Sequence, residues 1–409
     1  MARVASAFGG RRREPFAAAG RYGAAVPSPP RDLRLTYCGN VHAAPDLDTW
    51  LHGLHENAAP VAAHARARGR AFGIGSWWPA DLAALLSTDA AAFARVRGEL
   101  DRLQLPLWTM NVFPHGGFHD AVVKTAVYAP DWAHEDRLQY TRACAEVAAR
   151  LAPPGAVVPL STLPLGWRPP GASADLRLMA RNLARAASAF AALEDRTGVR
   201  CVLALEPEPD CLLETCAQAA EFLDRWLFDE GGWTTVPAPL LRRHLGVCID
   251  LCHLFVVGED PVAALELLRR RGIAVPKVQV SSCLELRDGS RLDELLAFDE
   301  PRYLHQTAAE GGARALDLGD VRRRRAEFAR APRIRTHCHM PIYWDQPGAL
   351  GSTRAQLDHT LAAWRDLPEP PLFEVETYTW SVLPAALRDR PLPELLAREL
   401  DHAANLLGV

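Results

Sequence analysis

The sequence predicts an α/β protein with the (β/α)8 TIM barrel fold. Short apolar or β-branched runs alternate eight times with stretches rich in Ala, Leu and Arg that repeat at helical period. Acidic residues follow several of these runs, and the active sites of such barrels lie where the strands end. The length of 409 residues suits one barrel with insertions, although it also allows two domains.

The expected strands and helices follow one another in the order that the barrel requires. Strands are expected at 33–38 (LRLTYC), 72–76 (FGIGS), 106–113 (PLWTMNVF), 157–163 (VVPLSTL), 202–206 (VLALE), 246–250 (GVCID), 277–282 (KVQVSS) and 372–377 (LFEVET). Helices are expected at 46–68, 80–102, 135–151, 174–197, 214–228, 261–271, 353–366 and 391–407. Each short apolar run is followed by a stretch with helical spacing, so each pair forms one βα unit.

Residues 1–31 are expected to form a disordered leader, and residues 32–409 the barrel. The leader contains three consecutive arginines and the Pro-rich end PSPPRD, but it lacks the central apolar stretch of a signal peptide. No run approaches the roughly 18 apolar residues of a transmembrane helix. The 9 cysteines are scattered without zinc-ribbon spacing, which indicates buried thiols in a reducing compartment. We therefore expect a cytoplasmic protein without membrane insertion.

A long insertion, 283–352, separates the seventh strand from the helix that follows it. It contains an additional apolar run, 333–342 (RIRTHCHMPI), with two histidines. Segments that follow a strand lie at the carboxyl face of a barrel, and loops of this length usually have a function or are disordered. We interpret the insertion as a lid that carries ligands; the alternative is a β-hairpin that only covers the barrel mouth.

The charge and the lysine content exclude some functions. A formal net charge of −3 argues against a protein that binds nucleic acid. The chain has only two lysines, Lys124 and Lys277, so a Schiff-base mechanism would have to use one of them.

Three acidic residues at strand ends predict a cation. Glu206 ends the fifth strand, Asp250 the sixth and Glu376 the eighth. Three carboxylates at one barrel mouth repel one another unless a cation neutralises them. The alternative is that they are solvated loop carboxylates. Oxygen donors with some imidazole suit Mg, Mn, Co, Fe or Zn.

Other polar residues lie near the same mouth. Side chains two apart on a strand share a face, so His337 and His339 point the same way and form a paired-histidine metal candidate. A hydrogen-bonded loop pair is the alternative. Glu374 shares a face with Glu376 and is expected to support it. Gln279 in the seventh strand is a weaker ligand candidate than a histidine or a carboxylate. The alternative is a polar side chain that fills space inside the barrel. Further candidates follow the third and fifth strands: His115, His119, Glu208 and Asp210.

These motifs resemble those of a known superfamily. GVCIDLCHLFVVGED resembles the sixth-strand motif of endonuclease IV-type enzymes within the xylose isomerase-like barrels, and LALEPEPD and PLFEVET resemble the glutamate motifs of the fifth and eighth strands. With LTYCGNVH, FGIG, NVFPHGGFH, STLPLG, VQVSS and VETYTW, the set over about 33–407 is most similar to EboE-type metabolite traffic proteins, which are sugar isomerase/epimerase-like barrels.

The resemblance implies a divalent metal held by Glu206, Asp250 and Glu376. His253 resembles the histidine that binds substrate in the epimerases and a second metal in the nucleases. Gln279 departs from the pattern, because the seventh strand usually supplies a histidine there. The nucleases also have a second-strand histidine, absent from GIGSWW, and an Asp-x-His pair, where Leu295 replaces the histidine. His337 and His339 could substitute for that pair and hold a second metal.

The leading hypothesis is a metal-dependent isomerase or epimerase that acts on a small polyol, sugar or cyclitol-like metabolite. The metal would polarise a carbonyl and its neighbouring hydroxyl, and Glu206 and Glu376 would exchange a proton through a metal-bound enediolate, with His253 beside them. Tryptophans near strand ends could stack on a sugar ring or simply pack: Trp77, Trp78, Trp167, Trp344 and Trp380. The alternatives are a metal-dependent phosphoesterase or abasic-site nuclease and a non-catalytic metabolite carrier. No nucleic-acid partner is expected, whereas partners in a small-metabolite pathway are expected.

Overall fold

Eight parallel strands form the barrel sheet, so the predicted fold class is confirmed. The computed structural model describes residues 33–168, 173–229 and 234–409, and the expected leader lies outside them. The strands are β1 (Leu35–Tyr37), β2 (Ile74–Ser76), β3 (Leu107–Asn111), β4 (Val157–Thr162), β5 (Arg200–Leu205), β6 (Leu245–Asp250), β7 (Ala274–Val280) and β13 (Leu372–Val375). All eight coincide with expected strands.

The strand order is that of a barrel, β1-β13-β7-β6-β5-β4-β3-β2. The register places Gln279 on β7 between Asp250 on β6 and Glu374 on β13. At the seam, Thr36 Oγ1 on β1 donates a hydrogen bond to the Gly73 carbonyl just before β2, at 2.7 Å. The barrel is therefore nearly closed, and the carboxyl ends of its strands meet at one mouth.

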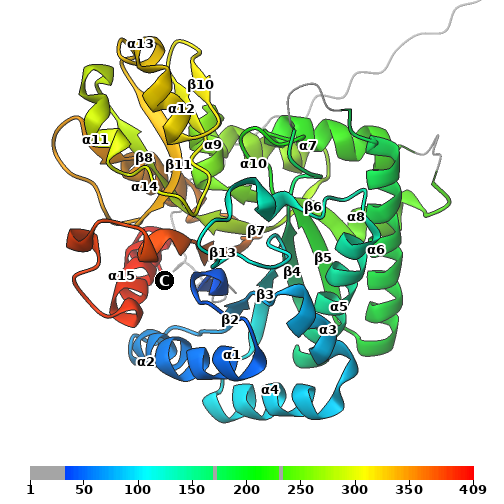
Figure 1. Cartoon of the computed structure of the whole chain (residues 1–409). Helices are drawn as coiled ribbons and strands as arrows, with labels where there is room; N and C mark the ends of the chain where they lie inside the picture. The colour runs from blue at the N-terminus through cyan, green and yellow to red at the C-terminus, as the bar shows by residue number, and fades with distance from the viewer. Residues whose placement is uncertain (1–32, 169–172, 230–233) are drawn as a thin grey trace, which may run out of the picture. The chain divides into compact units, whose positions relative to one another are not determined.

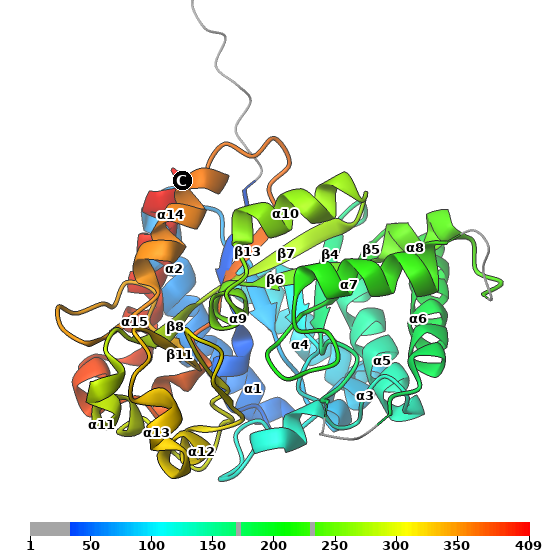
Figure 2. The same ribbon diagram turned by 90° about the horizontal axis from the view of Figure 1, so that it is seen from above.

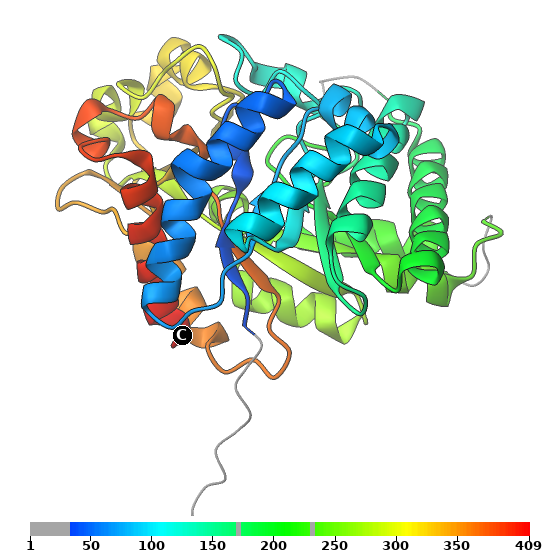
Figure 3. The same cartoon turned by 90° about the horizontal axis from the view of Figure 1, so that it is seen from below.

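Helices surround the sheet as expected (Figure 1). They are α1 (Leu47–Gly53), α2 (Ala59–Ala67), α3 (Ala80–Thr88), α4 (Ala90–Leu103), α5 (Glu135–Leu151), α6 (Leu176–Thr197), α7 (Cys216–Leu223), α8 (Ala238–His244), α9 (Leu251–Val257), α10 (Pro261–Arg270), α14 (Arg354–Trp364) and α15 (Leu392–Leu407). Seen from above, α7, α8 and α10 cover the outer face of β5 to β7 (Figure 2). The last helix, α15, packs beside α2 (Figure 3), where Asp401 pairs with His64 at 2.9 Å.

The single helix expected at 80–102 is two helices, α3 and α4. Asp89 lies between them with an extended backbone, and its carboxylate accepts hydrogen bonds from the amides of Ala91 and Ala92. An Asp N-cap of this kind starts a new helix, which the apolar periodicity alone does not reveal.

The insertion after β7 contains a second, antiparallel sheet of order β10-β9-β11-β8-β12. Its strands are β8 (Ser282–Leu286), β9 (Thr307–Ala309), β10 (Arg314–Ala315), β11 (Ile334–Met340) and β12 (Leu350–Ser352), and its short helices are α11 (Leu292–Leu296), α12 (Leu318–Arg323) and α13 (Arg325–Phe328). The additional apolar run forms β11, which pairs with β8 and β9 and packs on α9. The segment is therefore more elaborate than a hairpin.

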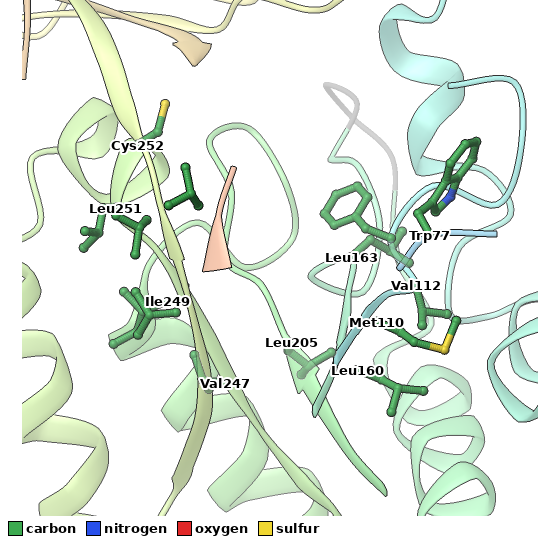
Figure 4. Packing of buried hydrophobic residues seen from close by; sticks show 14 of the residues in the cluster. Trp77, Met110, Val112, Leu160, Leu163, Leu205, Val247, Ile249, Leu251 and Cys252 are labelled. Atoms are coloured by element: carbon green, nitrogen blue, oxygen red, sulfur yellow. The ribbon is translucent and has the colours of Figure 1, made fainter. Parts of the chain in front are cut away.

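A large apolar core fills the spaces between strands and helices. Figure 4 shows part of it, with Leu160, Leu205 and Val247 contributed by neighbouring strands. All 9 cysteines are buried and unpaired. In the described part of the chain, no helix has the length and apolar character needed to cross a membrane.

An ion pair lies inside the barrel. Lys277 Nζ on β7 is 2.5 Å from Glu374 Oε2 on β13, and both side chains are fully buried. Burial alone lowers the pKa of Lys277, but the Glu374 carboxylate outweighs it and raises that pKa, so the lysine is held in its charged form. Lys277 is therefore a structural counter-ion rather than a nucleophile, since a Schiff base needs a neutral amine.

Glu399 on α15 is expected to make stability depend on pH. It accepts hydrogen bonds from Thr377 Oγ1 at 2.6 Å and from the Ile342 amide at 3.1 Å, and burial raises its pKa from 4.5 to about 7. Between these two values the folded state binds more protons than the unfolded state, so stability falls as pH rises. Urea unfolding of the wild type and of Glu399→Gln at pH 4.5 and pH 7.5 provides the measurement. From the lower to the higher pH, the wild type should lose up to about 3 kcal/mol of unfolding free energy that the variant does not lose. Parallel pH profiles would contradict this.

Candidate metal centre

Three carboxylates converge at the barrel mouth. Glu206 follows β5, Asp250 ends β6 and Glu376 follows β13, and each offers an oxygen within 4.8 Å of the other two. All three side chains are buried, with at most 3% of each residue exposed. The carboxyl ends of parallel strands bring them together, as the sequence predicts.

Asp250 is oriented by its position at the start of α9. Its Oδ1 accepts hydrogen bonds from the His253 amide at 2.9 Å and from Ser281 Oγ at 2.8 Å. Among the described residues, its Oδ2 has no hydrogen-bond partner, and neither does Oε2 of Glu206. Two buried carboxylate oxygens are thus left facing the mouth without a donor, as a cation site requires.

Glu376 is held by two asparagines that the sequence does not single out. Asn40, after β1, and Asn111, at the end of β3, donate side-chain hydrogen bonds to its Oε1, at 2.7 and 3.0 Å. Both are polar residues at or just after a strand end, which is the same signal that identifies the carboxylates. They fix one oxygen of Glu376.

The electrostatics of the three acids favour a bound cation. Burial and Asp250 raise the pKa of Glu206 well above its usual range, and burial and Glu206 do the same for Glu376. Burial also opposes ionisation of Asp250, but His253 and His339 outweigh it and lower its pKa. A divalent cation would compensate these charges, so the donor set fits a metal.

His339 on β11 reaches the carboxylates. Its Nδ1 donates a hydrogen bond to the Glu376 carbonyl at 2.6 Å, so its Nε2 carries a lone pair. That Nε2 lies 4.0 Å from Asp250 Oδ2 and has no hydrogen-bond partner within residues 33–168, 173–229 and 234–409. The insertion thus supplies an imidazole to the carboxylate centre, whereas the seventh strand supplies Gln279 instead of the histidine that the resemblance implies.

Gln279 is buried within the barrel. Neither its Oε1 nor its Nε2 has a hydrogen-bond partner in the described part of the chain. An amide oxygen can bind a cation, although less strongly than a carboxylate or imidazole does. Its assignment as a ligand remains a prediction.

A second group lies beside the first. Glu208, His253 and His337 each offer a donor atom within 4.8 Å of the others, and all three are buried. Burial raises the pKa of Glu208 to about 8 and lowers that of His253 to about 4. Burial also lowers the pKa of His337 well below its usual value, so both imidazoles are neutral at pH 7.

A small cavity opens next to both groups. Glu206, Glu208, Glu376, His253 and His337 line it together with aromatic side chains, among them Phe113, Phe118, Tyr128, Tyr303 and Tyr378. These rings, rather than tryptophans, provide apolar faces for a bound molecule.

The other candidates lie elsewhere. None of the five tryptophans considered for sugar stacking lines the cavity; for example, Trp77 is buried and donates its indole N–H to the Pro114 carbonyl at 2.9 Å. His115 packs against Tyr140, and His119 bonds the Asn40 carbonyl. Asp210 faces Arg314. These residues are explained by packing and surface pairing.

Comparison with known proteins decides the family. A family model described as a xylose isomerase-like TIM barrel matches residues 67–300. The chain belongs to the xylose isomerase-like TIM barrel family. A search of the curated proteins gave no match.

The chain is similar to several solved structures. The IOLI protein with a bound zinc atom is 12% identical, with 92% of this chain and 98% of that chain covered and a TM-score of 0.47. L-ribulose 3-epimerase is 13% identical, with 92% and 93% covered and a TM-score of 0.47. An AP endonuclease of family 2 from Brucella melitensis is 17% identical, with 60% and 78% covered and a TM-score of 0.37.

Proposed function

We propose that the protein is a divalent-metal-dependent isomerase or epimerase that acts on a small sugar- or cyclitol-like metabolite. The observation that carries the proposal is the placement of two buried glutamates, Glu206 and Glu376, on either side of Asp250 at one small cavity. Burial and repulsion by neighbouring carboxylates raise the pKa values of both carboxyl groups, which favours their use as proton acceptor and donor.

The metal would be held by Glu206, Asp250 and Glu376, with His339 and Gln279 as further ligands. When bound, it supplies a Lewis acid that polarises a substrate carbonyl and its neighbouring hydroxyl. This mixed oxygen and imidazole set is compatible with Mg, Mn, Co, Fe or Zn.

The glutamates would perform the proton transfer. Glu206, whose Oε2 has no hydrogen-bond partner in the part of the chain that the structure describes, removes the proton from the carbon next to the carbonyl. Glu376, oriented by Asn40 and Asn111, exchanges a proton with the substrate on its other side. His253 faces the same cavity and contacts the substrate. The aromatic walls exclude water from the substrate's apolar face.

The narrower assignment belongs to the same proposal. The motifs along about 33–407 resemble EboE-type metabolite traffic proteins, which would place the enzyme in a cytoplasmic small-metabolite biosynthesis or traffic pathway with pathway partners. A second candidate is a metal-dependent phosphoesterase related to the abasic-site nucleases, and the additional group Glu208, His253 and His337 favours it. A non-catalytic metabolite carrier is disfavoured, because binding alone does not require three clustered acids.

Solvent exchange tests the proposal. Metal-loaded protein is incubated in D2O with ketopentoses, ketohexoses and keto-cyclitols, and deuterium uptake next to the carbonyl is followed by NMR. We expect uptake with at least one compound and a loss of about 100-fold or more in Glu206→Gln and Glu376→Gln. Glu221→Gln, an exposed position on α7, is the matched control.

Two outcomes would reject the proposal. One is the absence of exchange in every compound by metal-replete wild-type protein. The other is deuterium exchange at the wild-type rate in both glutamate variants. Hydrolysis of a phosphodiester such as bis(p-nitrophenyl) phosphate under the same conditions would favour the second candidate instead.

A further inference from the structure

The cavity beside the carboxylate centre has a polar end and an apolar end. Two asparagines, three glutamates and two histidines form the polar end. The other end is lined by the segment after β3, with Phe118, Val123 and Val127, and by the segment before β9, with Tyr303 and Leu304. We call these five residues the apolar wall.

Contacts between the two segments hold the apolar wall together. The centroid of the Phe118 ring lies 5.3 Å from that of Tyr303, and Tyr378 packs on both rings at 5.2 and 4.9 Å. The Val123 amide donates a hydrogen bond to the Arg302 carbonyl at 2.8 Å. The segment after β3 and the insertion therefore form one continuous surface that shares the cavity with the carboxylates.

Two tyrosines at the border of the apolar wall turn their hydroxyls toward the polar end. Tyr128 Oη donates to Glu208 Oε1 at 2.6 Å, and Tyr378 Oη lies 3.3 Å from His337 Nε2. Their rings remain available to the cavity, but their hydroxyls are already committed to the polar group.

Tyr303 also contributes its ring rather than its hydroxyl. Among the described residues, the hydroxyl makes no hydrogen bond of good geometry. It lies near Arg302 and Ser381, which pair with each other at 2.9 Å at the protein surface. Burial raises the pKa of Tyr303 to about 12, although Arg302 and Ser381 oppose that rise, so the hydroxyl is oriented toward these two residues.

Lys124 is the only lysine or arginine among the described residues that line the cavity, and its charge is already paired. Its Nζ donates to the Asp317 carboxylate at 2.6 Å and to the carbonyls of Glu300 and Tyr303 at 2.9 and 2.7 Å. An ammonium group has three hydrogens, so all of them are engaged. The described lining therefore has no cation available for a phosphate or carboxylate group at this end.

Polar substituents are poorly accommodated against the apolar wall. A buried hydroxyl without a partner loses the hydrogen bonds that it makes with water, and an unpaired charged group loses more. A sugar carries a hydroxyl on nearly every carbon, so its end far from the carboxylates would meet only rings and methyl groups. An alkyl group gains free energy in the same place, because it leaves water.

We propose that the substrate is amphipathic, with neighbouring oxygens at the carboxylate centre and an end without hydroxyl or phosphate groups against the apolar wall. The inference rests on the proposed function for the oxygen-bearing end. It narrows the substrate from a fully hydroxylated sugar to a hydroxy ketone that carries an alkyl or other apolar group. Fully hydroxylated ketoses are then weak substrates that react only at high concentration.

A matched pair of hydroxamates tests the proposal. Hydroxamates bind divalent cations through two oxygens, and butyrohydroxamate and threonohydroxamate have the same four-carbon chain and differ only in three hydroxyls. Both are titrated calorimetrically into metal-loaded full-length protein. We expect the Kd of butyrohydroxamate to be lower by about 10-fold or more, equivalent to about 1.4 kcal/mol. Equal Kd values, or tighter binding of threonohydroxamate, overturn the proposal.

Val123→Thr places a hydroxyl on the apolar wall with little change in volume. It should bind threonohydroxamate more tightly and butyrohydroxamate less tightly, so that the ratio of the two Kd values changes by about 3-fold or more. The matched control is Val122→Thr, because Val122 is the preceding residue, is 62% exposed and does not line the cavity. It should keep the wild-type ratio. Since the affinity of each compound for the free cation is the same for all three proteins, the change in ratio reports the wall. An unchanged ratio in Val123→Thr rejects the proposal.

A measurement without metal separates this inference from the proposed function. Saturation-transfer NMR with 1,2-butanediol requires neither a cation nor turnover, and the methyl protons should receive more saturation from metal-free protein than the CH2OH protons do. Equal or reversed saturation overturns the inference. If no compound exchanges deuterium while the methyl preference and the hydroxamate ratio hold, the isomerase proposal fails and the specificity of the apolar wall stands.

Discussion

Asp250→Asn is expected to abolish cation binding at the carboxylate centre. The amide oxygen can still accept from the His253 amide and Ser281, so the start of α9 is preserved. The atom at the position of Oδ2 becomes an N–H donor that faces Glu206 and Glu376, and a ligand and a negative charge are lost. Because the loss of a supporting hydrogen bond alone weakens metal sites 10- to 100-fold, we expect a decrease in affinity of about 100-fold or more.

Thermal unfolding in the presence of metal provides the measurement. At a free cation concentration of 100 times Kd, binding stabilises the wild type by about 2.7 kcal/mol, and nearly all of this gain should disappear in the variant. Asp260→Asn is the matched control, because Asp260 is also an aspartate N-cap, at the start of α10 and outside the candidate metal-ligand groups. Full metal-dependent stabilisation of Asp250→Asn would refute the ligand assignment.

Lys277→Met is expected to have the largest effect on stability. It leaves Glu374 charged or forces it to take up a proton, at a fully buried position with no other cation in contact among the described residues. Breaking a buried ion pair in this way costs about 3–5 kcal/mol. The positive charge of Lys277 also lowers the pKa values of Glu206 and Glu376. Its removal should therefore raise both pKa values further and shift any pH–rate profile to higher pH.

The double variant Lys277→Met with Glu374→Gln separates charge from packing. It removes both charges and keeps both volumes, so urea unfolding should show it to be more stable than Lys277→Met alone. If the double variant is as unstable as the single one, packing rather than charge explains the effect. If Lys277→Met unfolds within about 1 kcal/mol of the wild type, the ion pair is not a stabilising feature.

The barrel could be predicted because its strands are short apolar runs separated by long amphipathic helices. Its irregular parts could not. The helices α8 and α9 have only 7 residues each, too few for periodicity to show, and the split at Asp89 depends on a side-chain cap. The second sheet joins β8 to β11, which pairs residues about 50 positions apart without a local turn signal.

The candidate site likewise contains contacts that could be predicted from the sequence and contacts that could not. Glu206, Asp250 and Glu376 could be predicted as neighbours because strand ends in a parallel barrel share one rim. The contact between His253 and His337 spans 84 positions and depends on how the second sheet packs on α9. No sequence pattern encodes that contact, so the pairing of the two rings emerges only in the folded chain.

The location of β11 has a consequence for how this site could diversify. The oxygen donors lie at the ends of the barrel strands themselves, whereas His337 and His339 come from a segment inserted after β7. Substitutions confined to that insertion could exchange nitrogen for oxygen at the mouth and retune which ion is preferred, while the anionic scaffold stays unaltered. In this architecture, the barrel framework and the nitrogen donors at its mouth are separately adjustable parts.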